Sequence, residues 1–480
     1  MNEIPRPDNH VIVIFGGNGD LSKRKLLPAL YHLVVEGMMP ADYRIIGNSR
    51  SEFTDAQFDD FARSSIDEFS RCELEESVFK EFADRLTYVS HEFQPGSTDP
   101  LQEAISAAEK ELSGDVRLLF YLSVPPAAFA PITEGIGECG FQDRARVVFE
   151  KPFGTDLESF QELSRVVHSV LDESQIFRID HFLGKEAVQN ILALRFANGM
   201  FEPVWNRHHI DNVQIDVPEE LGIESRATFY EETGALKDML VTHLFQVLSF
   251  VAMEPPYALE PKALADETGK VFESIVPLGV DDVVRGQYVG YLEEDGVSDH
   301  SDTETFVAAC MHIDNWRWAG VPFFLRTGKR LKSKHQVITL AFKEPPRKMF
   351  REDESVWFEN DHLSMDLGEH GGVSITFLAK KPGAGIELGP AHMDFRHEGH
   401  FGSELIEAYE RLLHDAMLGD RTLYTRGDGI ERTWEVVDKV LRDPPPLYEY
   451  EPGTWGPEAS DELIAPRRWH VMKPLYPERD

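Results

Sequence analysis

Two segments carry the residue types that acid–base chemistry on an anionic substrate requires. The first, from Arg178 to Glu186, contains Asp180, His181 and Lys185, and the second contains His243. A histidine whose ring is oriented by a carboxylate can act as a general base. A histidine and a lysine beside a helix N-terminus can bind a phosphate group, because free amides and the helix dipole favour anions there. The two segments therefore predict proton abstraction from a phosphorylated substrate.

His243 falls on the inner side of a predicted helix, whose apolar residues are Leu236, Leu240, Leu244, Val247, Leu248 and Val251. A lone histidine on such a face is more often a satisfied core residue than a catalyst, and this alternative stays open. As a base, His243 needs a carboxylate partner. Asp238 is a poor candidate, because five residues along an α-helix place two side chains roughly 140° apart. Asp180 is the better geometric candidate.

Asp180 also resembles the N-cap of the helix predicted to follow it. His181 and Lys185 are four residues apart, so on that helix they project from one face. A capped helix with surface cations is the alternative interpretation of this segment.

Three further lysines are candidates for anion contacts. Lys151 follows the fifth predicted strand in Glu150-Lys151-Pro152-Phe153-Gly154, and ligands of parallel sheets lie beyond the carboxyl ends of the strands. This position predicts Lys151 between cofactor and substrate, with a plain loop lysine as the alternative. Lys329 and Lys334 lie in a turn between predicted strands, where simple solvation is the alternative.

A glycine turn follows the first predicted strand, Val11–Phe15. It reads Gly16-Gly17-Asn18-Gly19-Asp20-Leu21 and leads into a helical pattern. Glycine lets the backbone turn sharply and lets a pyrophosphate approach the helix N-terminus. The spacing is not the usual GxGxxG, but its place after the first strand of an alternating pattern favours dinucleotide binding over a plain turn.

The end of the second predicted strand bears on the choice between NAD and NADP. Enzymes that use NAD usually place an acidic residue there for the ribose hydroxyls. Here the strand runs into Gly47-Asn48-Ser49-Arg50, and a guanidinium suits a 2′-phosphate. Arg50 therefore favours NADP; Glu52 is close enough to blunt that preference, so use of NAD and a plain surface arginine stay open.

The composition narrows the classes of partner and compartment. The formal net charge is −36, which argues against nucleic acid and anionic membrane as partners. The three cysteines have no CxxC spacing and the first ten residues lack the apolar region of a signal peptide, so we expect a cytoplasmic protein. The apolar stretch Leu240–Met253 is too short to span a bilayer and predicts a core helix. The cluster His392, Asp394, His397, Glu398 and His400 matches no trusted metal spacing, and we expect no metal.

The order of the elements predicts the fold. Strand candidates alternate with helical patterns over the first third, which indicates a Rossmann-type, doubly wound parallel sheet of the α/β class. The candidates are Val11–Phe15, Tyr43–Ile46, Leu86–Val89, Arg117–Leu122, Arg146–Phe149 and, more weakly, Ile176–Ile179. Later strand candidates follow one another directly, which indicates a large β+α domain with a mostly antiparallel sheet. We place the boundary near residue 180, giving domains of 1–180 and 181–480.

These motifs together closely resemble one family, the glucose-6-phosphate 1-dehydrogenases. The resemblance covers nearly the whole chain and rests on the glycine turn, EKPFG at 150–154, RIDHFLGKE at 178–186, NILALRFAN at 190–198, KDMLVTH at 237–243, GVPFFLRTGK at 320–329 and EAYERLLHDAMLGD at 407–420. It implies a Rossmann domain joined to a β+α domain that builds a homodimer or homotetramer. It also implies oxidation of glucose 6-phosphate at C1 with NADP, the entry step of the pentose phosphate pathway.

The resemblance implies roles for individual residues. His243 would be the general base, Asp180 would orient it, and Arg50 would meet the 2′-phosphate of the cofactor. His181 and Lys185 would hold the 6-phosphate of the sugar. The further residues implied to contact the sugar or its phosphate are Lys151, Glu219, Asp238, Lys329 and Lys334; those implied to meet the cofactor are Gly16, Gly19, Asp20, Leu21 and Lys151.

Two positions depart from the family pattern. Phe182 stands where the family usually has tyrosine, so one hydroxyl contact to phosphate is missing, and Asn18 is bulkier than the usual residue of the glycine turn. Two other functions stay open. One is oxidation of a neutral sugar, which needs no phosphate site. The other is a catalytically silent NADP-binding regulator, which the presence of both His243 and Asp180 disfavours.

Overall fold

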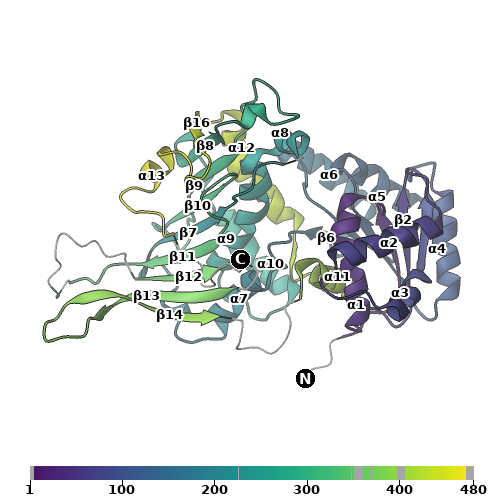
Figure 1. The fold of residues 1–480 in the computed structure, drawn as a ribbon, viewed down its shortest axis with the longest axis horizontal. Coiled ribbons are helices and arrows are strands. Elements are labelled where there is room, and N and C mark those ends of the chain that lie inside the picture. The colour runs from purple at the N-terminus through teal and green to yellow at the C-terminus, as the bar shows by residue number, and fades with distance from the viewer. Residues whose placement is uncertain are drawn as a thin grey trace. The chain divides into compact units, whose positions relative to one another are not determined.

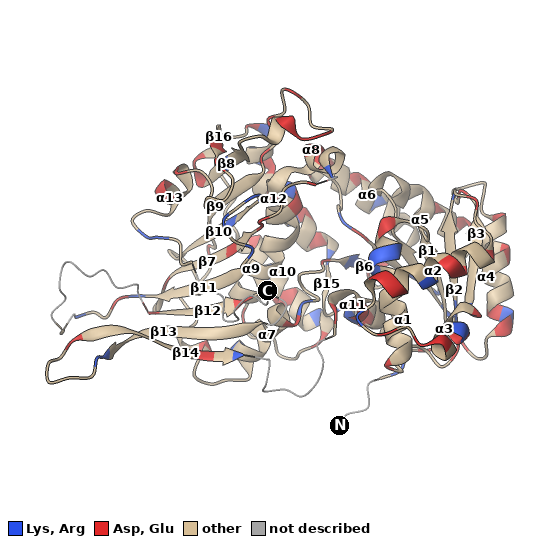
Figure 2. Cartoon of the chain, in the orientation of Figure 1, with Lys and Arg blue, Asp and Glu red and all other residues tan. Residues whose placement is uncertain are grey.

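The computed structural model describes residues 5–224, 226–347, 349–350, 361–368, 371–396 and 406–471. The chain forms two compact units (Figure 1). Unit 1 contains Met1–Gly184, Pro256–Ala265 and Leu405–Glu431, and unit 2 contains Lys185–Pro255, Asp266–Glu404 and Arg432–Asp480. Acidic residues are spread over the helices and connections of both units (Figure 2), in keeping with the net charge of −36.

Unit 1 is built on a seven-stranded sheet in the order β15-β6-β5-β4-β1-β2-β3. Neighbouring strands are parallel, except that β15 runs antiparallel to β6. The strands are β1 (His10–Phe15), β2 (Tyr43–Ser49), β3 (Leu86–Ser90), β4 (Arg117–Leu122), β5 (Ala145–Phe149), β6 (Ile176–Ile179) and β15 (Tyr424–Thr425). The order 3-2-1-4-5-6 is that of a Rossmann sheet, so the predicted fold class of this part is confirmed.

Helices cover this sheet and begin at residues suited to capping. The oxygen of Thr54 accepts a hydrogen bond from the amide of Gln57 at the start of α2, and Asp156 does the same for Ser159 in α6. Helix α1 packs on α2, α3 and α11, whereas α5 packs on α6. The helices are η1 (Ser22–Leu26), α1 (Leu27–Val35), α2 (Asp55–Phe69), α3 (Glu76–Ala83), α4 (Asp99–Glu111), η2 (Pro126–Ala128), α5 (Phe129–Glu138), α6 (Leu157–Val170), η3 (Glu173–Gln175) and α11 (Ala408–Leu418).

Unit 2 is built on a nine-stranded sheet in the order β14-β13-β12-β11-β7-β10-β9-β8-β16. The β7–β10 and β8–β16 pairs are parallel and the others are antiparallel, which confirms a mostly antiparallel sheet. The strands are β7 (Ile210–Pro218), β8 (Val283–Tyr288), β9 (Phe306–His312), β10 (Pro322–Gly328), β11 (Val337–Phe342), β12 (His362–Asp366), β13 (Gly372–Lys380), β14 (Leu388–Arg396) and β16 (Leu447–Tyr450).

The core of unit 2 contains one long apolar helical stretch packed on β9 and β10. This stretch, Ala227–Ala252, is long and apolar enough to cross a membrane by length and composition alone. Its most apolar window is 89% buried inside the protein, as in the core helix of a soluble protein. The helical elements are α7 (Glu186–Phe196), η4 (Glu202–Val204), α8 (Ala227–Ala235), η5 (Leu236–Leu244), α9 (Phe245–Ala252), α10 (Pro261–Ser274), η6 (Val280–Asp282), η7 (Tyr291–Glu293), α12 (Gly427–Arg442) and α13 (Ala459–Ile464). The first residues of α10 and α12 belong to unit 1.

Candidate active site

The glycine turn of unit 1 lies where the strand order reverses, between β1 and β4. Gly16 has a φ of +77°, and a Cβ atom there would stand 2.0 Å from the carbonyl oxygen of Ser123, which follows β4. At Gly17 a Cβ atom would stand 2.7 Å from the Cα atom of Gly47 in β2. Dinucleotides bind in Rossmann sheets at this crevice, where backbone must approach the pyrophosphate closely. The turn therefore fits a dinucleotide.

The helix that follows the turn begins near Asp20 and Leu21 and passes through η1. Three basic residues lie in its first two turns, but each already faces a carboxylate. Lys23 pairs with Glu68 at 2.8 Å, Arg24 with Asp20 at 3.0 Å and Lys25 with Glu407 at 2.9 Å. The amides of Gly16 and Gly17 also donate within the protein, to the carbonyl oxygen of Asn48, and the amide of Gly19 donates to that of Gly16. Anion binding by this segment therefore stays a prediction.

Arg50 directly follows the last residue of β2, at the carboxyl edge of the sheet. Its side chain is 81% exposed, and Nη1 lies 3.7 Å from Oε1 of Glu92. Such an exposed pair is weak, so the guanidinium can turn to a phosphate at little cost. Asn48 is buried at the same edge, and its amide donates to the carbonyl oxygens of Val89 and His91.

The end of β5 places Lys151 beside a carboxyl group that the sequence analysis did not single out. The hydroxyl of Tyr121 donates to Oε1 of Glu150 at 2.5 Å, and Tyr409 of α11 forms a second hydrogen bond to this carboxyl group. Burial raises the pKa of Glu150, and the bonds from the two tyrosines and the charge of Lys151 counter that effect. Glu150 lies in EKPFG at 150–154 and Tyr409 in EAYERLLHDAMLGD at 407–420, two of the motifs that carry the family resemblance.

The segment after β6 differs from its prediction. Oδ1 of Asp180 accepts a hydrogen bond from the amide of Phe182 at 2.9 Å, so Asp180 caps a turn and not a helix. Helix α7 begins only at Glu186, with Lys185 as its N-cap residue. His181 and Lys185 therefore do not share a helical face, because the intervening residues form turns. Asp180 is buried and His181 is partly exposed.

His243 is fully buried, and its helix has π rather than α geometry. It lies in η5, with Asp238 buried in the same segment. A π-helix bonds each residue to the one five positions away, so Asp238 and His243 are one turn apart. The angle of roughly 140° that set Asp238 aside holds only for an α-helix, so it does not apply to this helix, and the choice of Asp180 as the partner of His243 stays a prediction. The helix follows Gly234, whose φ is +58°, and Glu304 caps it by accepting from the amide of Leu236 at 3.0 Å.

Unit 2 brings several of its predicted substrate residues into polar contacts. Nζ of Lys329 lies 2.6 Å from Oε2 of Glu219, and the Lys329 side chain is buried, so simple solvation does not describe it. Nζ of Lys185 donates to Oε1 of Gln336 at 2.9 Å. Gln336 lies two residues after Lys334, which is exposed. Lys329 and Glu219 follow directly on the paired ends of β10 and β7.

The histidine cluster near β14 is only partly within the described residues. His392 contacts Oγ1 of Thr376 at 3.0 Å, and Oγ of Ser374 donates to Asp394 at 2.7 Å, so both are engaged across the β13–β14 pair. His397, Glu398 and His400 lie outside the residues that the structure describes.

A Rossmann sheet with a dinucleotide-fitting glycine turn is joined in one chain to a unit that holds a buried histidine and a lysine–glutamate pair. Together these features indicate a dinucleotide-dependent oxidoreductase. Family models agree. One described as "Glucose-6-phosphate dehydrogenase, NAD binding domain" matches residues 13–190, and one described as "Glucose-6-phosphate dehydrogenase, C-terminal domain" matches residues 192–470. The chain belongs to the glucose-6-phosphate dehydrogenase family, as its motifs predicted.

Individual relatives match over almost their whole length. The chain is 40% identical to the glucose-6-phosphate 1-dehydrogenase of Aggregatibacter actinomycetemcomitans over 482 residues, which is 96% of each protein. A crystal structure of the Mycobacterium avium enzyme covers 99% of this chain with a TM-score of 0.87 and 38% identity. A structure of a glucose-6-phosphate dehydrogenase in complex with glucose 6-phosphate covers 98% of this chain, with a TM-score of 0.89 and 31% identity.

Proposed function

We propose that this chain oxidises C1 of D-glucose 6-phosphate to 6-phospho-D-glucono-1,5-lactone and passes the hydride to NADP⁺. This is the entry step of the pentose phosphate pathway. The observation that carries the proposal is the likeness, over 98% of the chain and 100% of the other, to a structure that holds glucose 6-phosphate. The glycine turn at the strand reversal supports the dinucleotide half of the reaction.

In this mechanism the chain moves a proton and holds charge. A nitrogen of the His243 ring accepts the proton of the C1 hydroxyl as the hydride leaves C1, and bound NADP⁺ supplies the hydride acceptor. Asp180 orients the His243 ring and stabilises its cationic form. The burial of both side chains supports these roles, because charges interact more strongly where water is excluded.

The phosphorylated substrate needs local cations, because the net charge of −36 repels it at long range. His181 and Lys185 hold the 6-phosphate. The other proposed contacts to the sugar or its phosphate come from Lys151, Glu219, Asp238, Lys329 and Lys334. The bonds from Lys185 to Gln336 and from Lys329 to Glu219 support this assignment, because each holds an ammonium in place.

We assign the cofactor site to Gly16, Gly19, Asp20, Leu21, Arg50 and Lys151, in a nucleotide-binding domain of residues 1–180. Arg50 favours NADP over NAD, with NAD as the weaker cofactor. We further propose a cytoplasmic homodimer or homotetramer that binds neither nucleic acid nor membrane, in keeping with the acidic composition.

The test compares four assays on the purified protein and a His243→Asn variant. Nicotinamide reduction is followed with glucose 6-phosphate or glucose, and with NADP⁺ or NAD⁺. We expect the phosphorylated sugar and NADP⁺ to give the highest kcat/KM, and the variant to lose at least about 10³-fold in kcat with little change in substrate binding. Equal turnover of glucose would overturn the phosphate site and favour a neutral-sugar dehydrogenase. Cofactor binding without any turnover would indicate a silent regulator.

A further inference from the structure

The main chain of Lys329 is held on both sides by a small buried network. The amide of Lys329 donates to the carbonyl oxygen of Thr305 at 2.8 Å. The hydroxyl of Tyr450, the last residue of β16, donates to the carbonyl oxygen of Lys329 at 2.7 Å. This hydroxyl also lies 2.9 Å from Oγ1 of Thr305. Burial raises the pKa of Tyr450, so its hydroxyl stays protonated and remains a donor.

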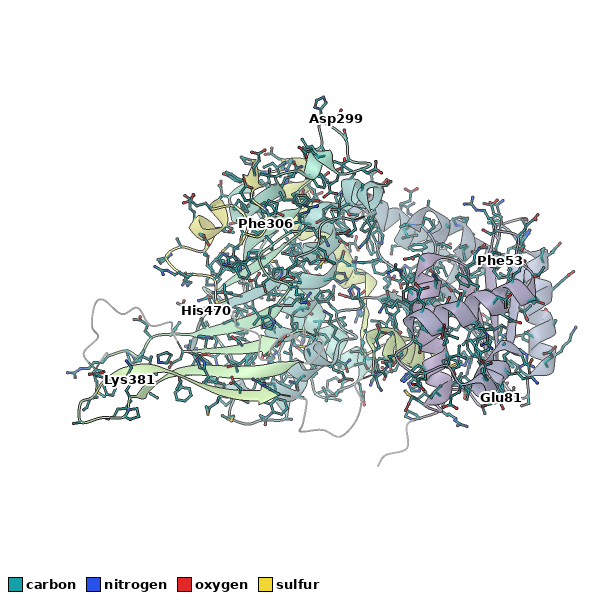
Figure 3. The ribbon with its side chains drawn as sticks, viewed as in Figure 1. Phe53, Glu81, Asp299, Phe306, Lys381 and His470 are labelled. Atoms are coloured by element: carbon teal, nitrogen blue, oxygen red, sulfur yellow. The ribbon has the colours of Figure 1, made fainter. Side chains whose placement is uncertain are left out.

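The segment that follows Tyr450 lies against the same turn. The amide of Gly453 donates to the carbonyl oxygen of Arg330, and the amide of Lys332 donates to that of Thr454, both at 2.8 Å. The Tyr450 ring packs 5.7 Å from the ring of Phe306, a core residue labelled in Figure 3. Residues 329–332 are therefore fixed by residues about 120 positions later in the chain.

The side chain of Lys329 has little freedom once its backbone is fixed. Its ammonium lies 2.6 Å from Glu219 and 5.7 Å from the centroid of the Tyr230 ring. The backbone of Glu219 is tied to the same turn, since its amide donates to Gly328 and its carbonyl accepts from Leu331. The position of the Lys329 backbone thus sets where the ammonium and the Glu219 carboxylate meet a ligand.

We infer that Tyr450 is a positioning residue for the phosphosugar site: its hydroxyl fixes the main chain of Lys329 and thereby aims the Lys329 ammonium at the substrate. The inference rests on the proposed function, in which Lys329 contacts the sugar or its phosphate. The Tyr450 hydroxyl itself contacts the main chain of Lys329 and the side chain of Thr305. No part of the Lys329 sequence motif reveals this contact, because the hydroxyl comes from β16.

Tyr450→Phe removes one hydroxyl and keeps the ring in the core. We expect KM for glucose 6-phosphate to rise by roughly two- to tenfold, as the loss of one hydrogen bond of ordinary net strength predicts. KM for NADP⁺ should stay within about twofold, and kcat should fall by less than KM rises. Tyr448→Phe is the matched control, because Tyr448 lies on the same strand and the residue is 43% exposed. It should leave all constants unchanged.

Thr305→Val is a second variant, for use if Tyr450→Phe fails to fold. It removes the other hydroxyl bonded to Tyr450 and should raise KM for glucose 6-phosphate by a smaller factor. The thermal midpoint of every variant is measured alongside. A purely structural role would lower the midpoint of Tyr450→Phe and leave KM of the folded enzyme unchanged, and this result would overturn the inference.

The Lys329→Ala background distinguishes a failure of the inference on Tyr450 from a failure to place Lys329 in the substrate site. If Tyr450 acts through Lys329, then Tyr450→Phe raises KM in the native background and adds nothing to Lys329→Ala. Equal increases in both backgrounds would show that Tyr450 acts by another route and would contradict the inference. If Lys329→Ala alone leaves KM unchanged, the assignment of Lys329 to the substrate site fails, and the inference fails with it.

Discussion

Arg326 of β10 and Asp216 of β7 form a buried ion pair between strands that run side by side. The Nε and Nη2 atoms of Arg326 lie 2.9 and 2.5 Å from the two carboxylate oxygens, and the side chains are 1% and 4% exposed. The guanidinium also lies 4.2 Å from the ring centroid of Trp469 and 5.0 Å from that of Trp455. The pair fixes the register of β7 and β10, which end beside Glu219 and Lys329.

Replacing Arg326 should destabilise unit 2 strongly. In Arg326→Met the carboxylate of Asp216 stays buried without its cation, which typically costs about 3–5 kcal/mol. We expect this loss in the free energy of unfolding, measured by urea denaturation with tryptophan fluorescence. The double variant Arg326→Met with Asp216→Leu should recover much of the loss, because it removes the stranded charge as well.

Arg442→Met serves as the control for this experiment. Arg442 pairs with Asp438 at 2.9 Å, but its side chain is 76% exposed. Breaking an exposed pair should change the free energy of unfolding by no more than about 0.5 kcal/mol. An equal effect of the two single variants would mean that the buried pair adds no more stability than a surface one.

Local sequence patterns predicted the strands and helices that show a clear periodicity of apolar residues. The run Val11–Phe15 forms β1, and Arg117–Leu122 forms β4. The two-residue β15 and the short β16 have no such pattern, because they are strands only through pairing with distant partners. The contact of Tyr450 with Lys329 likewise depends on pairing between distant parts of the chain, so the local sequence does not predict it.

The sequence predicted the helix of His243 but not its π geometry. Apolar spacing near 3.6 residues gives a helix, and an extra residue per turn leaves too small a change in the pattern to detect. Asp180 illustrates a related limit. Its residue type correctly indicated a capping side chain, but only the backbone path shows that it caps a turn ahead of α7.

Glu173 links β6 to the segment after α11, and its charge should control the acid stability of unit 1. Burial alone would raise its pKa, but Arg178 and Arg421 lower it from 4.5 to about 2. A carboxyl group with a lowered folded pKa stabilises the fold fully above its unfolded pKa. This stabilisation, on the order of 2–3 kcal/mol, should disappear as the pH falls from about 4.5 towards 2.

The Glu173→Gln variant tests this directly. Its thermal midpoint should lie well below that of the native protein at pH 7, and the gap should narrow steadily below pH 4. Glu68→Gln is the comparison, because Glu68 pairs with Lys23 on the exposed surface and should give a small difference at both pH values. A gap for Glu173→Gln that persists unchanged at pH 3 would rule out its charge as the cause.

The choice of cofactor should depend on Arg50, whose exposed side chain follows β2 directly. In Arg50→Met a 2′-phosphate loses a charge-assisted partner, so kcat/KM for NADP⁺ should fall by roughly 10–100-fold. The value for NAD⁺ should hardly change, because a ribose hydroxyl gains little from a guanidinium. Glu92→Gln, which frees Arg50 from its weak pair, should leave the preference for NADP⁺ unchanged or raise it slightly.

Arg63→Met is the control, because Arg63 forms an exposed pair with Glu76, and it should alter neither value of kcat/KM. If the ratio of the two kcat/KM values is unchanged in Arg50→Met, Arg50 does not set the cofactor preference and the prediction is wrong.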